Sequence, residues 1–314
     1  MNKWLAIILT MFAGVLAGAE IRTVGCTTYP VWLLTREITA GVPDVRTDLM
    51  IPAGTGCPHE YVLTPSDMRK LGAKNLIVVR NGLGLDDFVL RPLKKMNPEA
   101  PVIDACASLD ALHSECDHEH HHHSHGHDGH PGHHDHNGHH RHEHANPHLF
   151  ASPDTALGMV SNIAAGLCKA DPDNAAVYRK NELVLGGELR RLIAGMAELK
   201  PRIAGKYIVV QHGVFDYLAR ALGLKIAAEI QSEGIAPSAA EMRKLVKIIR
   251  EHKVAVIFTE PQYPAHTAET LAKECGVKVC QLDPLAGGPA DPPRDLYLRV
   301  MRENLNRIRS VLAK

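Results

Sequence analysis

Histidine is concentrated in one stretch, from Asp117 to His148, which reads DHEHHHHSHGHDGHPGHHDHNGHHRHEHANPH. Most of its other residues are Gly, Asp and Asn, and almost no apolar residue separates the histidines. A segment with so little to bury cannot offset its ordering entropy, so we expect a mobile loop inserted between two globular halves. Neutral imidazole is a common ligand of zinc, copper and nickel, so the loop is expected to bind such ions at neutral pH.

This loop has two simpler interpretations. The run His120 to His123 resembles a purification tag, but tags stand at chain termini and this run is internal. The loop can also be a metal sponge or a pH-responsive polyelectrolyte without a defined site, and we favour this interpretation for the loop itself. Its auxiliary metal ligands would be histidines near its start, namely His118, His120, His121, His122, His123, His125 and His127. A specific site must therefore lie elsewhere.

Three histidines and one carboxylate share a position at the edge of a predicted strand or helix. His59 follows a strand and a glycine-rich loop, and His148 follows a proline at the exit of the insertion. His212 stands between a strand and a helix, and Asp283 comes directly after a strand. Ligands of open parallel sheets bind beyond the carboxyl ends of the strands, so these four side chains can converge in a cleft. Tetrahedral zinc accepts such a set of nitrogen and oxygen ligands.

Each candidate ligand also has a simpler explanation. A single loop histidine is more often solvated or hydrogen-bonded than metal-bound, and Asp283 before a proline can merely start a turn. His252 is expected to interact favourably with a helix end, and His266 is expected to be exposed near a helix start. Cys57 can be a thiolate ligand, but a buried or disulfide-bonded cysteine is the simpler interpretation.

Strand and helix patterns alternate in both halves of the chain, which predicts α/β lobes with parallel sheets. We expect strands at 21–27, 45–51 and 75–80 in the first half and at 207–211, 225–230, 254–259 and 277–282 in the second. We expect helices at 30–40, 65–71, 153–168, 213–221, 238–252, 266–275 and 296–312. A longer helix, 175–199, has apolar residues on one face and is long enough to connect two lobes. Its Gly186-Gly187 pair can mark a bend.

The N-terminus has the pattern of a secretory signal peptide. A positive start, an apolar run from Trp4 to Leu16 and a small-residue cleavage signal at Ala17-Gly18-Ala19 predict removal of residues 1–19. No stretch approaches the about 20 apolar residues that a membrane-spanning helix needs, so we expect an exported protein without membrane insertion. Lys plus Arg equals Asp plus Glu at 35 each, which favours a small partner over nucleic acid or a membrane surface.

The seven cysteines are an odd number in a chain predicted to be exported. Disulfides are permitted in that environment, so at least one thiol is unpaired or bonded outside the chain. Cys275 and Cys280 are the most plausible local pair, although their spacing does not establish that the side chains face each other.

Several ordered motifs resemble one protein family. The segment IPAGTGCPHEYVLTPSDMRKL is similar to the GxDPHxYxPTPSD signature of the periplasmic metal-binding proteins of ABC importers for zinc and manganese, and NGLGLDDF resembles its continuation. Further matches are NPHLFASPDTA, VVQHGVFDYLARALGL, SEGIAPSAAEMRKLVKIIREHKVAVIFTEPQ, LDPLAGG and YLRVMRENLNRI. The resemblance covers nearly the whole chain after the signal peptide.

The resemblance implies two Rossmann-like α/β lobes joined by one long rigid helix, with a metal site in the cleft between them. It places His59 and His148 in the N-terminal lobe and His212 and Asp283 in the C-terminal lobe as the metal ligands. The expected organisation is a signal peptide (1–19), an N-terminal lobe (20–174) that includes the histidine-rich loop (117–145), a connecting helix (175–200) and a C-terminal lobe (201–314).

Within this family, a histidine at the third ligand position is typical of zinc binders, whereas manganese and iron binders usually have glutamate there. Imidazole suits borderline-soft zinc and carboxylate suits harder manganese, so His212 favours Zn²⁺, with Mn²⁺ as the alternative. The histidine-rich insertion also resembles that of ZnuA-type zinc binders. One departure is Cys57, which replaces the family's aspartate and can loosen His59 or alter selectivity, with Glu60 as a possible accessory ligand.

These observations predict a periplasmic, monomeric solute-binding protein that captures Zn(II) and delivers it to the membrane permease of an ABC importer. The alternatives are a manganese- or iron-binding member of the same family and an exported metal-buffering protein or adhesin. A zinc hydrolase is a further alternative, because a three-histidine site can activate water. We expect no enzyme, since the chain has no HExxH motif, no serine nucleophile elbow and no obvious general base apart from Glu60 or Glu233.

Overall fold

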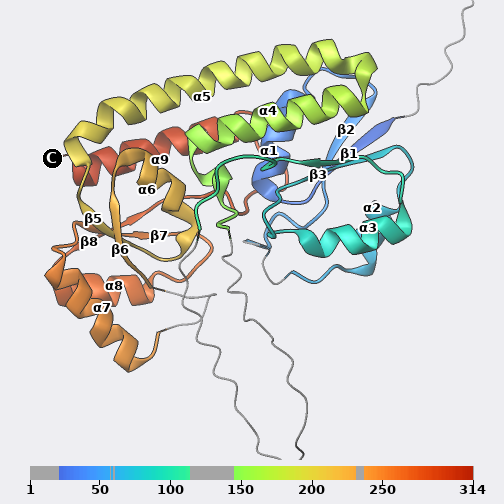
Figure 1. Cartoon of the computed structure of the whole chain (residues 1–314). Coiled ribbons are helices and arrows are strands. Elements are labelled where there is room, and N and C mark those ends of the chain that lie inside the picture. The colour runs from blue at the N-terminus through green and yellow to red at the C-terminus, as the bar shows by residue number, and fades with distance from the viewer. Residues whose placement is uncertain (1–20, 57, 59–60, 114–144, 231–236, 314) are drawn as a thin grey trace, which may run out of the picture.

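The computed structural model describes residues 21–56, 58, 61–113, 145–230 and 237–313. The predicted signal peptide and the histidine-rich segment up to residue 144 lie outside the described residues. The described chain forms two α/β lobes, each built around a parallel sheet (Figure 1), as the alternation of strands and helices predicted.

The N-terminal lobe contains a four-stranded parallel sheet in the order β2-β1-β3-β4. Its strands are β1 (Arg22–Cys26), β2 (Val45–Leu49), β3 (Leu76–Arg80) and β4 (Val102–Asp104), and its helices are α1 (Tyr29–Ile38), α2 (Pro65–Leu71), η2 (Asp87–Val89) and α3 (Leu90–Met96). The apolar run of β3 is almost wholly buried, as expected for a parallel strand covered on both faces. The N-cap of α2 is Thr64, whose hydroxyl accepts the backbone N–H of Asp67.

The C-terminal lobe repeats this strand order as β6-β5-β7-β8. Its strands are β5 (Tyr207–Val210), β6 (Lys225–Glu229), β7 (Val256–Thr259) and β8 (Lys278–Gln281), and its helices are η5 (Gly213–Phe215), α6 (Asp216–Leu222), α7 (Ala239–Glu251), α8 (His266–Cys275) and α9 (Leu296–Leu312). Parallel strands in one order place the carboxyl ends of all four at one edge of each sheet. His266 is exposed at the start of α8, as predicted.

Two long helices extend along both lobes. After η3 (Leu149–Ala151), these are α4 (Pro153–Ala170) and, following η4 (Pro172–Asn174), α5 (Ala175–Ile203). Figure 1 shows α5 above both sheets, and it contacts α1 and α4 as well as α6 and α9. It runs without interruption through Gly186-Gly187 and extends past the predicted end to Ile203, which is fully buried.

One hydrophobic core spans the two lobes. Val24 of β1 and Val79 of β3 belong to the same cluster of buried side chains as Val210 of β5 and Phe258 of β7. Side chains of α1, α4, α5 and α9 join these strands, and Leu189 of α5 is completely buried among them. Two smaller clusters lie against the other face of each sheet. The lobes are therefore packed as one body along their helical side.

The sequence did not predict β4 or α3, for local reasons. β4 has only three residues, and Val102 is 45% exposed, so no buried apolar run marks it. α3 contains Pro92 and buries only Leu93.

The predicted Cys275–Cys280 disulfide is wrong in this structure, where both thiols are free. Cys275 packs against the outer cluster of the C-terminal lobe, whereas Cys280 packs against the core shared by the lobes. The two side chains thus contact opposite faces of the sheet, which their close spacing in the sequence does not reveal.

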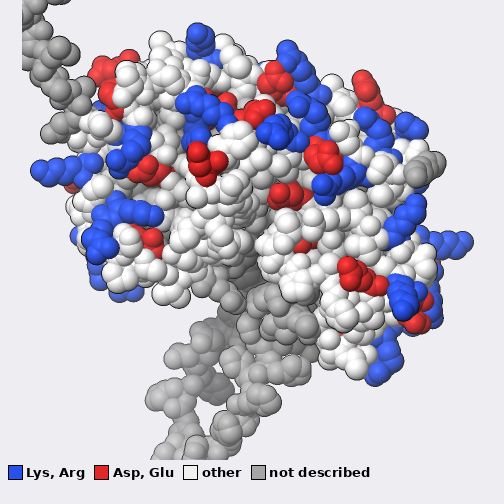
Figure 2. All heavy atoms as spheres, turned by 180° about the vertical axis from the view of Figure 1, so that it is seen from behind, with Lys and Arg blue, Asp and Glu red and all other residues white. Residues whose placement is uncertain are grey.

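Charged side chains of both signs are mixed on the surface. On the face drawn in Figure 2, Lys and Arg lie among Asp and Glu without a large patch of one sign. Among the described residues, no helix is both long enough and apolar enough to cross a membrane.

We expect Gly166→Ala to destabilise the protein and Gly187→Ala to stabilise it slightly. A methyl group on Gly166 of α4 would lie 2.5 Å from Cγ2 of Ile103, so the free energy of unfolding should fall by about 1–3 kcal/mol. Gly187 of α5 has nothing within 4 Å, so alanine there should add about 0.5–1 kcal/mol. Urea denaturation of the metal-free protein measures both, and equal effects would contradict this packing of α4 on β4.

Candidate metal centre

Four polar residues follow the four strands of the C-terminal sheet at its carboxyl edge. Glu229 ends β6, and His212 comes two residues after β5. Glu260 directly follows β7, and Asp283 comes two residues after β8. Because the strands lie in the order β6-β5-β7-β8, these residues form a row with His212 beside Glu260.

The N-terminal lobe contributes His148 to the same region. His148 is the residue before η3, and it is 97% buried, with an exposed fraction of only 3%. Its ring centroid lies 5.0 Å from that of His212, and the two rings meet edge to face at 80°. The structure thus brings together two predicted ligands from opposite lobes.

Asp283 is held by its own loop at the end of β8. Its Oδ1 accepts the backbone N–H of Leu285 at 2.7 Å. Asn304 of α9 fixes the backbone of Asp283, accepting its N–H at 3.0 Å and donating to its carbonyl at 2.7 Å. Burial raises the pKa of Asp283, and the Leu285 N–H opposes that rise.

Glu260 was not predicted, yet it is the most deeply buried carboxylate of the row. It is fully buried, its Oε2 accepts from Gln262 Nε2 at 2.5 Å, and its Oε1 lies 4.0 Å from His212 Nδ1. Among the described residues, Oε1 has no hydrogen-bond partner. The pKa of Glu260 is raised to about 8, mainly by burial and in addition by the negative charges of Glu229 and Asp283, while the hydrogen bond from Gln262 opposes the rise. Its position directly after a parallel strand could have indicated Glu260, because the same pattern led to the prediction of Asp283.

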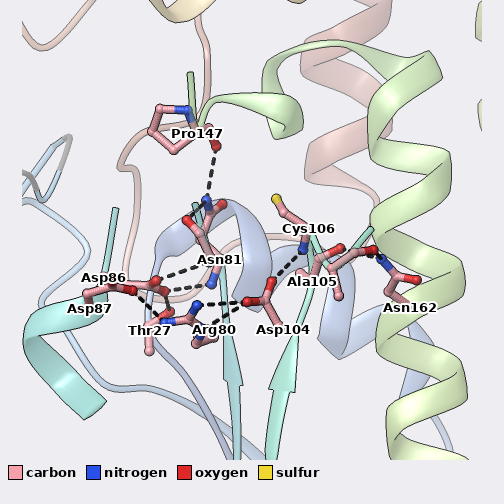
Figure 3. A network of polar contacts seen from close by, with 12 residues as sticks. Thr27, Arg80, Asn81, Asp86, Asp87, Asp104, Ala105, Cys106, Pro147 and Asn162 are labelled. Carbon is pink, nitrogen blue, oxygen red and sulfur yellow. Dashed lines mark hydrogen bonds and ion pairs between the residues drawn. The ribbon is translucent and has the colours of Figure 1, made fainter. Parts of the chain in front are cut away.

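A polar network fixes the carbonyl that precedes His148 (Figure 3). Asn81, at the end of β3, donates from Nδ2 to the carbonyl of Pro147 at 3.0 Å. Asp86 accepts the backbone N–H of Asn81 at 2.6 Å and that of Gly82 at 3.0 Å, and Thr27 donates to it at 2.5 Å. These bonds tie the His148 loop to the carboxyl edge of the N-terminal sheet. The NGLGLDDF motif is visible in the sequence, but the contact between its Asn81 and Pro147 could not be predicted from it.

The loop after β2 approaches the C-terminal lobe. The Gly288 N–H donates to the Ala53 carbonyl at 3.0 Å, and Tyr29 of α1 donates to the Pro289 carbonyl at 3.0 Å. A methyl group on Gly56 would lie 3.8 Å from Gln262. The segment leading to the predicted ligand His59 therefore lies against the same edge that carries Glu260.

The remaining predicted site residues lie outside the described residues. They are His59, Glu60, Cys57, Glu233 and the loop histidines His118, His120, His121, His122, His123, His125 and His127. Over the part of the chain that the structure describes, no group of three or more His, Cys, Asp or Glu side chains is arranged to hold a metal ion. The four-ligand set His59, His148, His212 and Asp283 therefore stays a prediction.

The fold and the site define a class of two-lobed protein in which imidazoles from both lobes meet at the facing edges of two parallel sheets. The chain belongs to the family described as "Zinc-uptake complex component A periplasmic", whose model matches residues 24–311.

Individual relatives agree with this assignment. The "High-affinity zinc uptake system protein ZnuA" of Bacillus subtilis is 32% identical over 294 residues, covering 91% of this chain and 86% of that protein. The "Zinc-binding lipoprotein AdcA" of Streptococcus pneumoniae is 30% identical over 291 residues, covering 90% of this chain but 54% of AdcA, so this chain spans about half of it. A structure of the solute-binding protein FpvC from Pseudomonas aeruginosa in complex with Mn²⁺ aligns with a TM-score of 0.75 and 29% identity, covering 93% of this chain and 98% of FpvC.

We expect the stability of the metal-free protein to fall as pH rises from about 5 to 8, in part because of Glu260. Its pKa is raised from 4.5 to about 8 in the folded state, so between these values the folded protein retains a proton that the unfolded chain has released. The free energy of unfolding must then decrease with pH across this window. Glu260→Gln cannot titrate and should remove this part of the slope.

Thermal melts of the metal-free wild type and Glu260→Gln across this pH range measure the difference. Glu251→Gln changes an exposed carboxylate at the end of α7 and serves as the control, which should follow the wild type. Parallel pH dependences for wild type and Glu260→Gln would contradict the prediction.

Proposed function

We propose that this chain captures Zn(II) between its lobes and delivers it to the permease of an ABC-type importer. The observation that carries this proposal is the contact between His148 and His212, two imidazoles from different lobes whose ring centroids are 5.0 Å apart. Imidazole nitrogen is one of the ligands that zinc accepts in proteins, and two imidazoles from different lobes at this spacing could bind one ion together. The names of two relatives, a zinc uptake protein and a zinc-binding lipoprotein, support the choice of ion.

The proposed ligands are His59, His148, His212 and Asp283. Two would come from each lobe, so a bound ion would join the lobes and favour the arrangement in which they meet. Four protein ligands would leave no open position for a reactive water, which supports capture rather than catalysis. The buried Glu260 beside His212 would add negative charge near the ion without being a required ligand.

We propose an N-terminal lobe (20–174), a connecting helix (175–200) and a C-terminal lobe (201–314), acting as a monomer in the periplasm after removal of residues 1–19. The histidine-rich loop would be an accessory that collects zinc and not the specific site.

Manganese is the second candidate ion, because the structural relative FpvC was solved with Mn²⁺. Manganese prefers carboxylate, carbonyl and water oxygens, whereas the paired imidazoles of His148 and His212 suit zinc. Competition between the two ions distinguishes the candidates.

Isothermal titration calorimetry of residues 20–314 tests the site. We expect one tight zinc event that outcompetes manganese and survives deletion of residues 117–143. His212→Ala should weaken this event by more than the roughly 10–100-fold that loss of a ligand's hydrogen-bond partner typically costs. His266→Ala, which removes an exposed histidine at the start of α8, is the matched control and should leave the event unchanged. Loss of tight binding with the loop deletion would show instead that the protein is a metal buffer.

We also expect Gly287→Ala to weaken zinc binding by disturbing the contact between the lobes. A methyl group there would lie 2.5 Å from the backbone oxygen of Ala53, which cannot rotate away as a side chain can. The loop that leads to His59 would have to shift. Gly54→Ala, in the same loop but with nothing within 4 Å, is the control and should bind zinc as the wild type does. Equal dissociation constants for the two variants would argue against this interlobe contact.

A further inference from the structure

Asn146 lies at the point where the histidine-rich insertion returns to the folded chain. Its neighbour Ala145 pairs with His113 in an isolated antiparallel bridge, and the Asn146 N–H donates to the Leu112 carbonyl at 2.7 Å. The hydroxyl of Tyr217 in α6 accepts the Leu112 N–H at 3.0 Å and donates to the Asn146 carbonyl at 2.6 Å. The backbone of Asn146 is thus held by a helix of the C-terminal lobe.

The side-chain amide of Asn146 makes four contacts, two to each lobe. Its Oδ1 accepts the backbone N–H of His148 at 3.0 Å and lies 2.8 Å from His148 Nδ1. Its Nδ2 donates to the Gly213 carbonyl at 2.9 Å and to Asp216 Oδ2 at 2.8 Å. Asn146 as a whole is buried, with an exposed fraction of 5%. Both amide hydrogens and both lone pairs of Oδ1 are in use.

These partners determine the orientation of the amide. A flipped amide would place its NH₂ group against the His148 N–H, so that two donors would face each other. It would also place its oxygen against a carbonyl and a carboxylate, which have no hydrogen to donate. The amide oxygen must therefore face His148.

The orientation of the amide in turn determines the tautomer of His148. Oδ1 carries no hydrogen, so the 2.8 Å contact is a hydrogen bond only if His148 Nδ1 is the donor. A neutral imidazole with its hydrogen on Nδ1 has a lone pair on Nε2, which is then the nitrogen that can act as a metal ligand.

We propose that Asn146 is a positioning residue that holds His148 in the Nδ1–H tautomer and in register with His212. The position of His148 relative to His212 is fixed because the same amide group donates to the carbonyl of Gly213, the residue after His212. This inference rests on the proposed function and adds to it: the ligand pair is oriented across the lobes before a divalent cation arrives. Less reorganisation is then needed on binding.

The competing explanation is that Asn146 only anchors the chain, because its backbone also bonds to Leu112 and Tyr217 where the insertion returns to the folded chain. Asn162 of α4 provides a matched control, since its Nδ2 likewise donates to two backbone carbonyls, those of Ala105 at 3.0 Å and Ala107 at 2.9 Å (Figure 3). Asn162 has no contact with either site histidine in these hydrogen bonds. Its loss should therefore affect stability without affecting the imidazole of His148.

The test reads the tautomer directly, in metal-free protein. Two-bond ¹H–¹⁵N correlation spectra of histidine-labelled residues 20–314 distinguish Nδ1–H from Nε2–H, and comparison with His148→Gln assigns the signal. We expect Nδ1–H in the wild type and in Asn162→Ala, and the appearance of Nε2–H in Asn146→Ala. Asn146→Asp keeps an acceptor for Nδ1–H, and its second oxygen can replace the amide donor toward Gly213 and Asp216 when it carries a proton. With that proton in place it should keep the wild-type tautomer, which provides a second variant if Asn146→Ala does not fold.

Calorimetry with zinc alone supplies the second readout. Asn146→Ala should raise the zinc dissociation constant by roughly 10–100-fold, and Asn162→Ala should not change it. Hydrogen on Nε2 in the wild type, loss of Nδ1–H in Asn146→Asp, or an Asn146→Ala variant with the wild-type tautomer or dissociation constant would overturn the proposal. Absence of tight zinc binding by the wild type would refute the proposed function instead, and the metal-free spectra would still test the effect of Asn146 on His148.

Discussion

The structure depends on the hydrophobic core that its two lobes share. Strands of both sheets and the helices α1, α4, α5 and α9 bury side chains in one cluster. Buried apolar area stabilises by roughly 25 cal/mol per Å², so moving the lobes apart along this side would expose surface at a large cost. The facing edges of the two sheets are therefore held at a spacing that the core defines. His148 and His212 meet because each stands at one of these edges.

The C-terminal edge has an electrostatic character that the overall charge balance hides. Glu229, Glu260 and Asp283 stand at or just beyond the ends of three of the four strands, and burial together with the negative charges of the other two raises the pKa of Glu260 to about 8. A carboxylate with so little solvent is costly to ionise unless a cation is near. His212 stands among these groups as the one imidazole of the row. The edge thus combines an imidazole with carboxyl groups that a nearby divalent cation would favour in their ionised form.

The candidate residues that the sequence predicted depend on local position, whereas those that it missed depend on distant contacts. Strand ends in an alternating α/β pattern indicated His212 and Asp283, and the same argument applied to the end of β7 would have indicated Glu260. Asn146 is the first residue of the NPHLFASPDTA motif. Its partners Gly213 and Asp216 are 67 and 70 residues away in the sequence, so no local pattern could assign it a role. Similarly, the spacing of two cysteines did not say which face of the sheet each contacts.

Because the lobes share a core, ion selection at the proposed site would depend more on the ligands than on how far the lobes close. A rigid pair of imidazoles cannot rearrange to offer the larger number of oxygen ligands that hard cations prefer. Divalent affinity for nitrogen-containing sites also rises from manganese to zinc, so rigidity adds to an existing preference. Hydrogen bonds from Asn81 and Asn146 on both sides of the Pro147-His148 dipeptide supply this rigidity at the N-terminal edge. A zinc site between the lobes would then discriminate against manganese because its loops are ordered before the ion binds. It would not need a large movement of the lobes.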